Sequence, residues 1–172
     1  GAKLGGLAPA QMEVAYARLH RLTQEVPFVV KLTEGQPFRR HVSQAEAKNA
    51  GAAARVEAAV ARPASLRAGL RLPKRAVNAG DGFLFVDHVG DICPSGFLPL
   101  ARGNVRTHDL AVTYRDDEFF RGLRDHSRLE GRCGRCEYRE VCGGSRARAW
   151  AVTGDARAED PACEHEASRR PS

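Results

Sequence analysis

Four of the five cysteines in this 172-residue sequence gather between residues 133 and 163. Cys133, Cys136 and Cys142 form a C-x2-C-x5-C pattern, and Cys163 follows Asp160-Pro161-Ala162. Thiolates are the soft ligands that zinc, copper(I) and iron–sulfur clusters require. A C-x2-C turn presents two of them to one site without a long loop to close. The alternatives are two disulfides or buried free thiols, which no other feature of the sequence supports. The pattern therefore predicts a bound inorganic centre held by these four cysteines.

The composition indicates a small protein with a thin core. Hydrophobic residues make up 42% of the sequence, aromatic residues make up 6%, and the mean hydropathy is −0.42. The length suits one domain, or one domain and part of a second. No apolar run approaches the roughly eighteen residues that would span a bilayer, and no secretion signal is recognisable. We therefore expect a cytoplasmic protein with no membrane partner, in which cysteines stay reduced and bind metal.

The formal charge of +6 raises the question of nucleic-acid binding. The basic residues are mostly arginines, and they are spread along the chain among 21 acidic residues. The few aromatic residues form no stacking platform of the kind that single-strand binders use. The sequence therefore disfavours nucleic acid as a partner.

The elements that precede the cysteines begin with an amphipathic helix predicted over residues 9–24, where apolar residues recur at three- and four-residue steps. Residues 28–32 predict a short buried strand. A helix followed by a buried strand is the repeating unit of a parallel α/β fold and cannot stand alone. Ser43 and Glu46 have capping-box spacing, which predicts an alanine-rich helix over 43–62. A basic stretch follows to about residue 78, and we interpret residues 43–79 as a linker.

The elements around the cysteines predict a separate α+β domain over residues 80–166, followed by a tail at 167–172. Residues 82–88 and the residues from Ile92 predict a β-hairpin. Phe119, Phe120 and Leu123 have helical spacing. The expected elements are strands at 82–88, 92–93 and 103–106, a helix over 116–126, the cysteine knuckle at 131–144, and a helix over 145–152 closed by Gly154.

The cysteine pattern carries a resemblance to a known family. Cys133-x2-Cys136-x5-Cys142-Gly-Gly, followed by Asp-Pro-x-Cys163, resembles the C-terminal auxiliary-cluster (SPASM/twitch) domain of radical S-adenosylmethionine enzymes. The segments Gly90-Asp91-Ile92-x-Pro94 and Leu98-x4-Gly103-Asn104-Val105 fit the same family. The resemblance covers residues 80–165, and the nearest subfamily includes haem-biosynthesis and peptide-modifying enzymes. It implies an α+β fold in which a small β-hairpin and short helices surround a cysteine-ligated cluster. The last α/β unit of a partial barrel would precede this domain, over residues 1–42.

The resemblance implies a [4Fe–4S] cluster bound by Cys133, Cys136, Cys142 and Cys163, with an electron-transfer or structural role. Three positions depart from the family pattern, since Ser95, His108 and Arg146 stand where cysteines are expected. We therefore expect one auxiliary cluster rather than two, with Cys93 as a spare thiol. Arg135, Arg146 and Arg148 would either offset the charge of the cluster or form a solvated helix face.

The catalytic C-x3-C-x2-C loop of the family is absent, because no cysteine precedes Cys93. The resemblance therefore implies the C-terminal part of a longer enzyme, and S-adenosylmethionine would bind only to the full-length protein. The implied partners are the rest of the barrel and a peptide or tetrapyrrole substrate. Whether this chain is itself an enzyme stays open, and no catalytic residue is assigned.

Two alternatives remain open from the residues alone. Four cysteines suit tetrahedral zinc equally well, which would make the chain a structural zinc-binding module that mediates protein or nucleic-acid interaction. A second alternative is a nucleophilic enzyme that pairs Cys93 with His88 or His108. His165, two residues beyond Cys163, could also replace a thiolate ligand.

Overall fold

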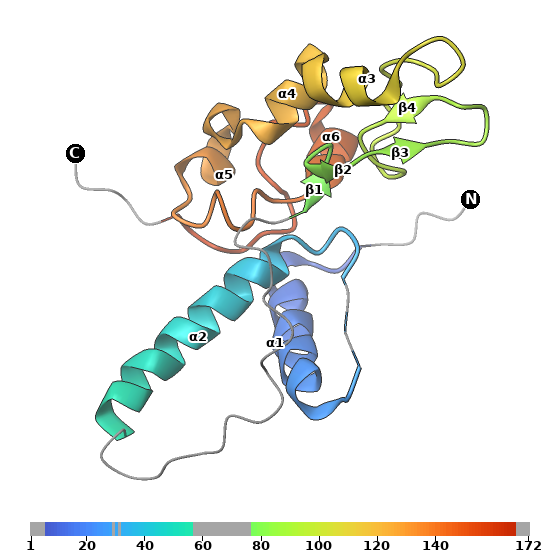
Figure 1. Cartoon of the computed structure of the whole chain (residues 1–172). Coiled ribbons are helices and arrows are strands. Elements are labelled where there is room, and N and C mark those ends of the chain that lie inside the picture. Colours follow the sequence, from blue (N-terminus) through green and yellow to red (C-terminus); the bar gives the residue numbers. More distant parts are fainter. Residues whose placement is uncertain (1–5, 29, 31, 57–76, 168–172) are drawn as a thin grey trace.

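The computed structural model describes residues 6–28, 30, 32–56 and 77–167. They form a helical pair and an α+β unit that meet at the N-terminal end of the second helix (Figure 1). The pair consists of α1 (Pro9–Glu25) and α2 (Pro37–Val56). The helix predicted over 9–24 is thus confirmed, and its Tyr16 is only 1% exposed and packs against Phe38 with the ring centroids 5.9 Å apart.

Two predictions for the helical region were wrong. Residues 28, 30 and 32 form no strand, and Phe28 is 65% exposed. A strand needs a neighbour for its backbone groups, and the strands among the described residues pair with one another at 78–93. The second helix begins at Pro37, not at Ser43, because the fixed φ of proline suits a first helical turn. Residues 57–62 of the predicted helix, and the basic stretch up to residue 76, lie outside the described residues.

The strands of the α+β unit form two small sheets. β1 (Asn78–Ala79) pairs in parallel with β2 (Gly82–Phe83), and β3 (Phe85–Val86) pairs antiparallel with β4 (Ile92–Cys93). The predicted hairpin is therefore present, but its first strand is divided at Leu84 between two partners. The strand predicted over 103–106 reduces to one bridge between Asn104 and Asp91, because the Asn104 carbonyl accepts the N–H groups of a turn. The described residues show an α+β arrangement in which these sheets close no barrel.

The helices of this unit are α3 (Leu110–Asp116), α4 (Glu118–Arg124), the 3-10 turn η1 (His126–Arg128), α5 (Gly131–Arg135) and α6 (Arg146–Thr153). The helix predicted over 116–126 is replaced by α4, since Asp117 caps it by accepting the N–H groups of Phe119 and Phe120. The preceding α3 was not predicted. The helix predicted over 145–152 is confirmed as α6, which Ser145 caps and Gly154 ends in the left-handed conformation at φ 79°.

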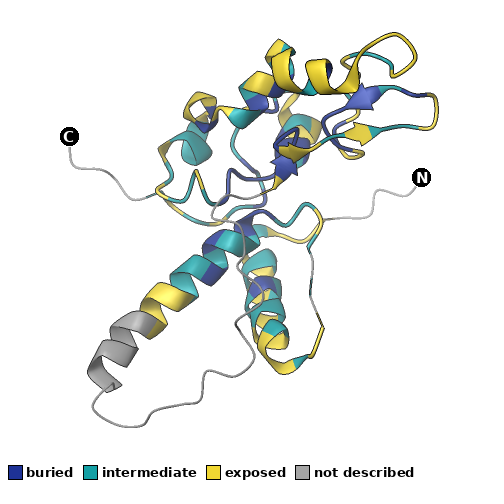
Figure 2. Cartoon of the chain, in the orientation of Figure 1, coloured by how far each residue is buried: buried dark blue, intermediate teal, exposed yellow. Residues whose placement is uncertain are grey.

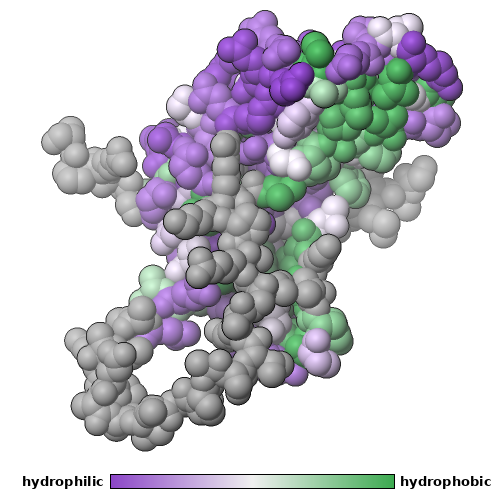
Figure 3. Space-filling model, in the orientation of Figure 1, coloured by the Kyte–Doolittle hydropathy of each residue, from purple (hydrophilic) through white to green (hydrophobic). Residues whose placement is uncertain are grey.

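The core is small, as the composition predicted. One cluster of buried residues in contact consists of small or medium-sized side chains: Ala79, Leu98, Leu123, Ala147 and Ala156. Figure 2 shows buried residues in the α+β unit and at the start of α2, where the two units meet. Figure 3 shows hydrophobic residues gathered on the hairpin side of the α+β unit, where Phe83, Phe85 and Phe97 are exposed. None of the described helices has an apolar stretch long enough to cross a membrane.

Candidate metal centre

The four cysteines predicted to bind metal surround one pocket. Cys133 lies in α5, Cys136 follows its last turn, Cys142 precedes the glycine pair, and Cys163 arrives from the C-terminal loop. All four line the same pocket. Cys93 does not line this pocket and is buried in β4. All five cysteines have free thiols, so the disulfide alternative is not realised.

Each of the four sulfur atoms accepts a backbone hydrogen bond. The N–H groups of Tyr138, Gly144 and Asp160 donate to Cys136, Cys142 and Cys133 respectively, each over 3.4 Å. The backbone of His165 hydrogen-bonds the fourth thiol, Cys163. Donors aimed at sulfur stabilise the thiolate form and tune a bound metal. The loops are therefore folded to present four hydrogen-bonded sulfurs to one space.

Burial opposes ionisation of these thiols. It raises the pKa of Cys142 to about 12, against a smaller lowering by the Gly144 N–H. Burial also raises the pKa of Cys136 and of Cys163. Neighbouring thiolates add to the upward shift at Cys142, because like charges repel one another. Cys136, Cys142 and Cys163 are therefore protonated at neutral pH in the metal-free site, and a bound cation would remove the cost of ionising them.

The glycine pair after Cys142 is required by the site. Gly143 and Gly144 have φ values of 67° and 63°, which glycine adopts without strain. A Cβ on Gly144 would lie 2.9 Å from the Cys133 sulfur and 2.6 Å from Nη2 of Arg146. The missing side chain of Gly144 therefore makes room beside the Cys133 sulfur.

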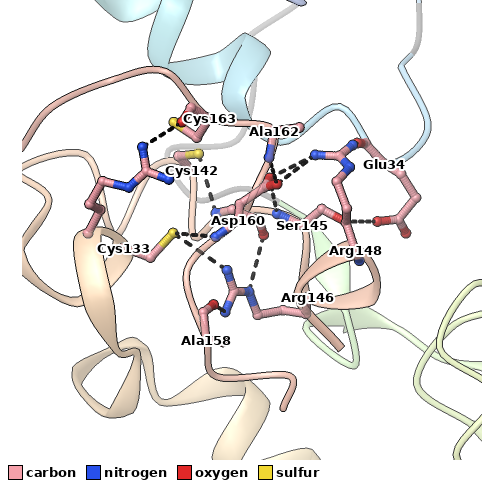
Figure 4. A network of polar contacts seen from close by, with 12 residues as sticks. Glu34, Cys133, Cys142, Ser145, Arg146, Arg148, Ala158, Asp160, Ala162 and Cys163 are labelled. Atoms are coloured by element: carbon pink, nitrogen blue, oxygen red, sulfur yellow. Dashed lines mark hydrogen bonds and ion pairs between the residues drawn. The ribbon is translucent and has the colours of Figure 1, made fainter. Parts of the chain in front are cut away.

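Asp160, in the Asp-Pro-x-Cys motif, connects the last cysteine to α6 (Figure 4). Its side chain is fully buried and accepts the N–H groups of Ser145, over 2.8 Å, and of Ala162, over 3.0 Å. Arg148 pairs with the same carboxylate at 2.8 Å. Because the N–H of Asp160 also donates to Cys133, this residue fixes the approach of two of the four sulfurs.

The three arginines that the sequence suggests as counter-charges of the cluster have different environments. Arg135 is exposed, as a solvated helix face would require. Arg148 pairs with Asp160. Arg146 is 1% exposed, so a solvated face is wrong for this residue, and its Nη2 donates to the Cys133 sulfur over 3.6 Å. Position 146 thus places a buried cation beside the Cys133 sulfur.

Arg40 of α2 was missed in the sequence. It is 3% exposed and lines the cysteine pocket. Glu13 of α1 forms an ion pair with its guanidinium, and Gln44 accepts a second hydrogen bond over 2.7 Å. The charge of Arg40 lowers the pKa of Cys163, opposing the larger effect of burial. No local pattern identifies Arg40, because only the folded chain brings α2 next to the cysteines.

The structure also shows the surroundings of His165 and of the two histidines suggested as partners of Cys93. Ligand atoms of Cys136, Glu137 and His165 lie within 4.8 Å of one another, and the His165 ring already contacts Glu137 at 3.1 Å. His88 and His108 are exposed. Burial raises the pKa of Cys93, which is the opposite of what an activated nucleophile requires. The nucleophilic alternative therefore finds no support at this residue.

Comparisons with known proteins find partial relatives of this chain. No protein-family model matches the sequence. The chain is 49% identical over 84 residues to the AdoMet-dependent heme synthase of Methanosarcina barkeri, covering 49% of this chain and 24% of that enzyme. It is 42% identical over 101 residues to the enzyme of the same name from Nitratidesulfovibrio vulgaris, covering 59% and 28%. It is 33% identical over 98 residues to the PqqA peptide cyclase of Bradyrhizobium diazoefficiens, covering 53% and 26%.

These matches confirm the predicted resemblance to radical S-adenosylmethionine enzymes. They do so as a partial similarity, since the matched part is about a quarter of the length of each of these relatives.

Proposed function

We propose that this chain binds a [4Fe–4S] cluster through Cys133, Cys136, Cys142 and Cys163, as the auxiliary-cluster region of a radical S-adenosylmethionine enzyme. The observation that carries the proposal is the pocket in which all four sulfurs gather, each with a backbone N–H donor. Backbone donors to sulfur are one of the means by which proteins set the potential of such clusters.

The spacing of the sulfurs favours a cluster over a single zinc ion. Four thiolates around one zinc, with Zn–S bonds of about 2.3 Å, would have sulfurs about 3.8 Å apart. Among the described residues, which include all five cysteines, no three cysteine sulfurs lie within 4.8 Å of one another. The thiols of the metal-free chain are therefore spread more widely than one zinc ion requires, which favours a larger polynuclear group.

The role that fits this arrangement is electron transfer, or stabilisation of the fold by linking separate segments of the chain. When bound, the cluster supplies one-electron chemistry and links the C-terminal loop to α5. Four protein thiolates would ligate all four irons of such a cluster and would leave no iron free to bind a substrate. The residues of this chain position the sulfurs, exclude water through burial, and place cations around an anionic centre.

The full-length activity is also a proposal. The relatives are named for heme synthesis and for cyclisation of the PqqA peptide. We extend to this chain a role in an enzyme that acts on a tetrapyrrole or a peptide, with S-adenosylmethionine bound outside residues 1–172. Residues 80–166 would form the auxiliary-cluster domain within it, and residues 1–42 would belong to the barrel. Arg40 and Gln44 contact the cysteine site from α2, so part of the helical pair also serves the cluster.

A cysteine series tests the ligand set. Single alanine variants of the four pocket cysteines, and Cys93→Ala as the matched control, are reconstituted anaerobically with iron and sulfide. We expect the broad absorption at about 400 nm to be lost or strongly reduced in the four variants and kept in Cys93→Ala. A Cys93 variant that loses the absorption, or a pocket variant that keeps all of its iron, would contradict the assignment.

A further inference from the structure

Arg146 is a buried cation whose charge is not balanced by a carboxylate. The guanidinium donates to the carbonyls of Ala156 and Ala158, each over 2.8 Å, and its Nε donates to the carbonyl of Gly144 over 3.3 Å. Its fourth acceptor is the Cys133 sulfur, 3.6 Å from Nη2. None of these acceptors is a carboxylate, and the side chain is 1% exposed. The Asp155 pKa is lowered chiefly by the Arg157 backbone N–H, and the charge of Arg146 makes a smaller contribution to that shift.

Two neighbouring buried charges, Asp160 and Arg40, each form an ion pair, and Arg146 differs from them in this respect. Asp160 is fully buried and has Arg148 at 2.8 Å. Arg40 is 3% exposed and has Glu13 as its ion-pair partner. A buried charge without a partner is strongly unfavourable, and a guanidinium cannot lose its proton to avoid that cost. Of the groups that accept hydrogen bonds from Arg146, the Cys133 sulfur is the one that can carry negative charge.

The geometry fixes the guanidinium in this orientation (Figure 4). Three carbonyl groups hold Nε and Nη1, which leaves Nη2 directed at the sulfur. Gly144 keeps the space open, because a Cβ there would lie 2.6 Å from Nη2. The carbonyl groups of Gly144, Ala156 and Ala158 therefore fix the position of the guanidinium.

We propose that Arg146 is the fixed counter-charge of the cysteine centre and raises the reduction potential of the cluster bound there. The inference rests on the proposed function, and it assigns a role to a position where the family pattern has a cysteine. A cation near a redox centre stabilises the reduced form, which carries one more negative charge. Since Arg146 is buried, salt screens this effect far less than it screens an exposed charge. Arg146 would act through Cys133 and the cluster, as a positioning residue.

The test is an anaerobic redox titration of the reconstituted 172-residue chain and three variants. Arg146→Gln removes the charge, Arg146→Lys keeps it, and Arg135→Gln removes an equal charge from an exposed position in the same knuckle. We expect a more negative midpoint potential for Arg146→Gln, a potential close to that of the wild type for Arg146→Lys, and no shift for Arg135→Gln. An iron-loaded Arg146→Gln variant with the wild-type potential would overturn the inference.

The outcomes in which a variant or the wild type fails to bind iron also test the proposal. If Arg146→Gln fails to retain iron, Arg146→Lys becomes the deciding variant. A lysine variant that retains iron at the wild-type potential supports the counter-charge. A lysine variant that also fails to retain iron overturns the proposal, because the several N–H donors of the guanidinium would then matter more than its charge. A wild-type chain that takes up no iron would refute the proposed cluster, which is distinct from an iron-loaded series with unchanged potentials.

Discussion

At Gly144, one added methyl group would meet the sulfur of a pocket cysteine. The φ of 63° at Gly144 favours glycine, and the added Cβ would lie 2.9 Å from the Cys133 sulfur. We expect Gly144→Ala to lose about 2–3 kcal/mol of stability from strain and displacement, and to retain less iron. Gly154→Ala is the matched control, since Gly154 has a φ of 79° and open space around it. It should lose only about 1 kcal/mol and keep its iron. Thermal unfolding and iron analysis measure both effects, and equal iron retention would contradict the close-contact argument.

The Cys142 thiol gives the metal-free protein a distinct pH dependence. Burial raises its pKa from 9.0 to about 12, so the folded state holds a proton that the unfolded state releases above about pH 9. Folding stability should therefore be fully present below pH 9 and fall as the pH rises toward 12, by about 1 kcal/mol per pH unit for this thiol. Thermal unfolding at about pH 8 and about pH 10 measures the change.

Two comparisons sharpen this pH test. Metal-free Cys142→Ala should lose less stability between the two pH values than the metal-free wild type, because the shifted thiol is gone. The cluster-loaded protein should also lose less, since its ligating thiols are already deprotonated. A metal-free wild type whose stability does not change between these pH values would contradict the assigned environment of Cys142.

The helical pair and the cysteine region are joined through the N-terminus of α6. The Ser145 hydroxyl donates to the Glu34 carboxylate over 2.6 Å, and Arg148 donates to the Glu34 carbonyl over 2.7 Å. The same hydroxyl accepts the Arg148 N–H as the helix cap. One side chain therefore stabilises a helix end and a contact between segments far apart in sequence.

Ser145→Ala should remove both of these interactions. We expect a loss of about 2–3 kcal/mol, as the sum of a cap and a hydrogen bond to a charged group. Asp109→Ala is the control, since Asp109 caps α3 by accepting the Val112 N–H at an exposed position. It should cost about 1 kcal/mol. Chemical denaturation measures both, and equal losses would show that the Glu34 contact contributes nothing.

Elements with strong local signals were predicted well, and those that depend on distant partners were not. The periodicity of α1 and the glycine stop of α6 helped to identify both helices, and the Ser145 cap of α6 is seen only in the structure. The strand at 28–32 was inferred from apolar residues alone, but a strand forms only where a partner offers hydrogen bonds. The helix predicted over 116–126 was wrong at its start, because the carboxylate of Asp117 caps a helix that begins at Glu118.

At the scale of the whole molecule, the ligand set is local in sequence but its surroundings are not. Spacing alone singled out the four cysteines that line one pocket. It could not identify Arg40, which reaches that pocket from α2, or distinguish Arg146 from a solvated arginine. Those roles depend on tertiary packing, which brings residues of the helical pair and the C-terminal loop to one site. The small apolar core leaves room for the proposed cluster to add to the stability of the fold.

The metal content of the protein tests the central claim most directly. The chain is purified and analysed without exposure to oxygen, and iron, acid-labile sulfide and zinc are measured per chain. The cysteine pocket predicts about four irons and about four sulfides, with no stoichiometric zinc. About one zinc per chain, with no iron or sulfide, would contradict the cluster and identify a structural zinc site instead.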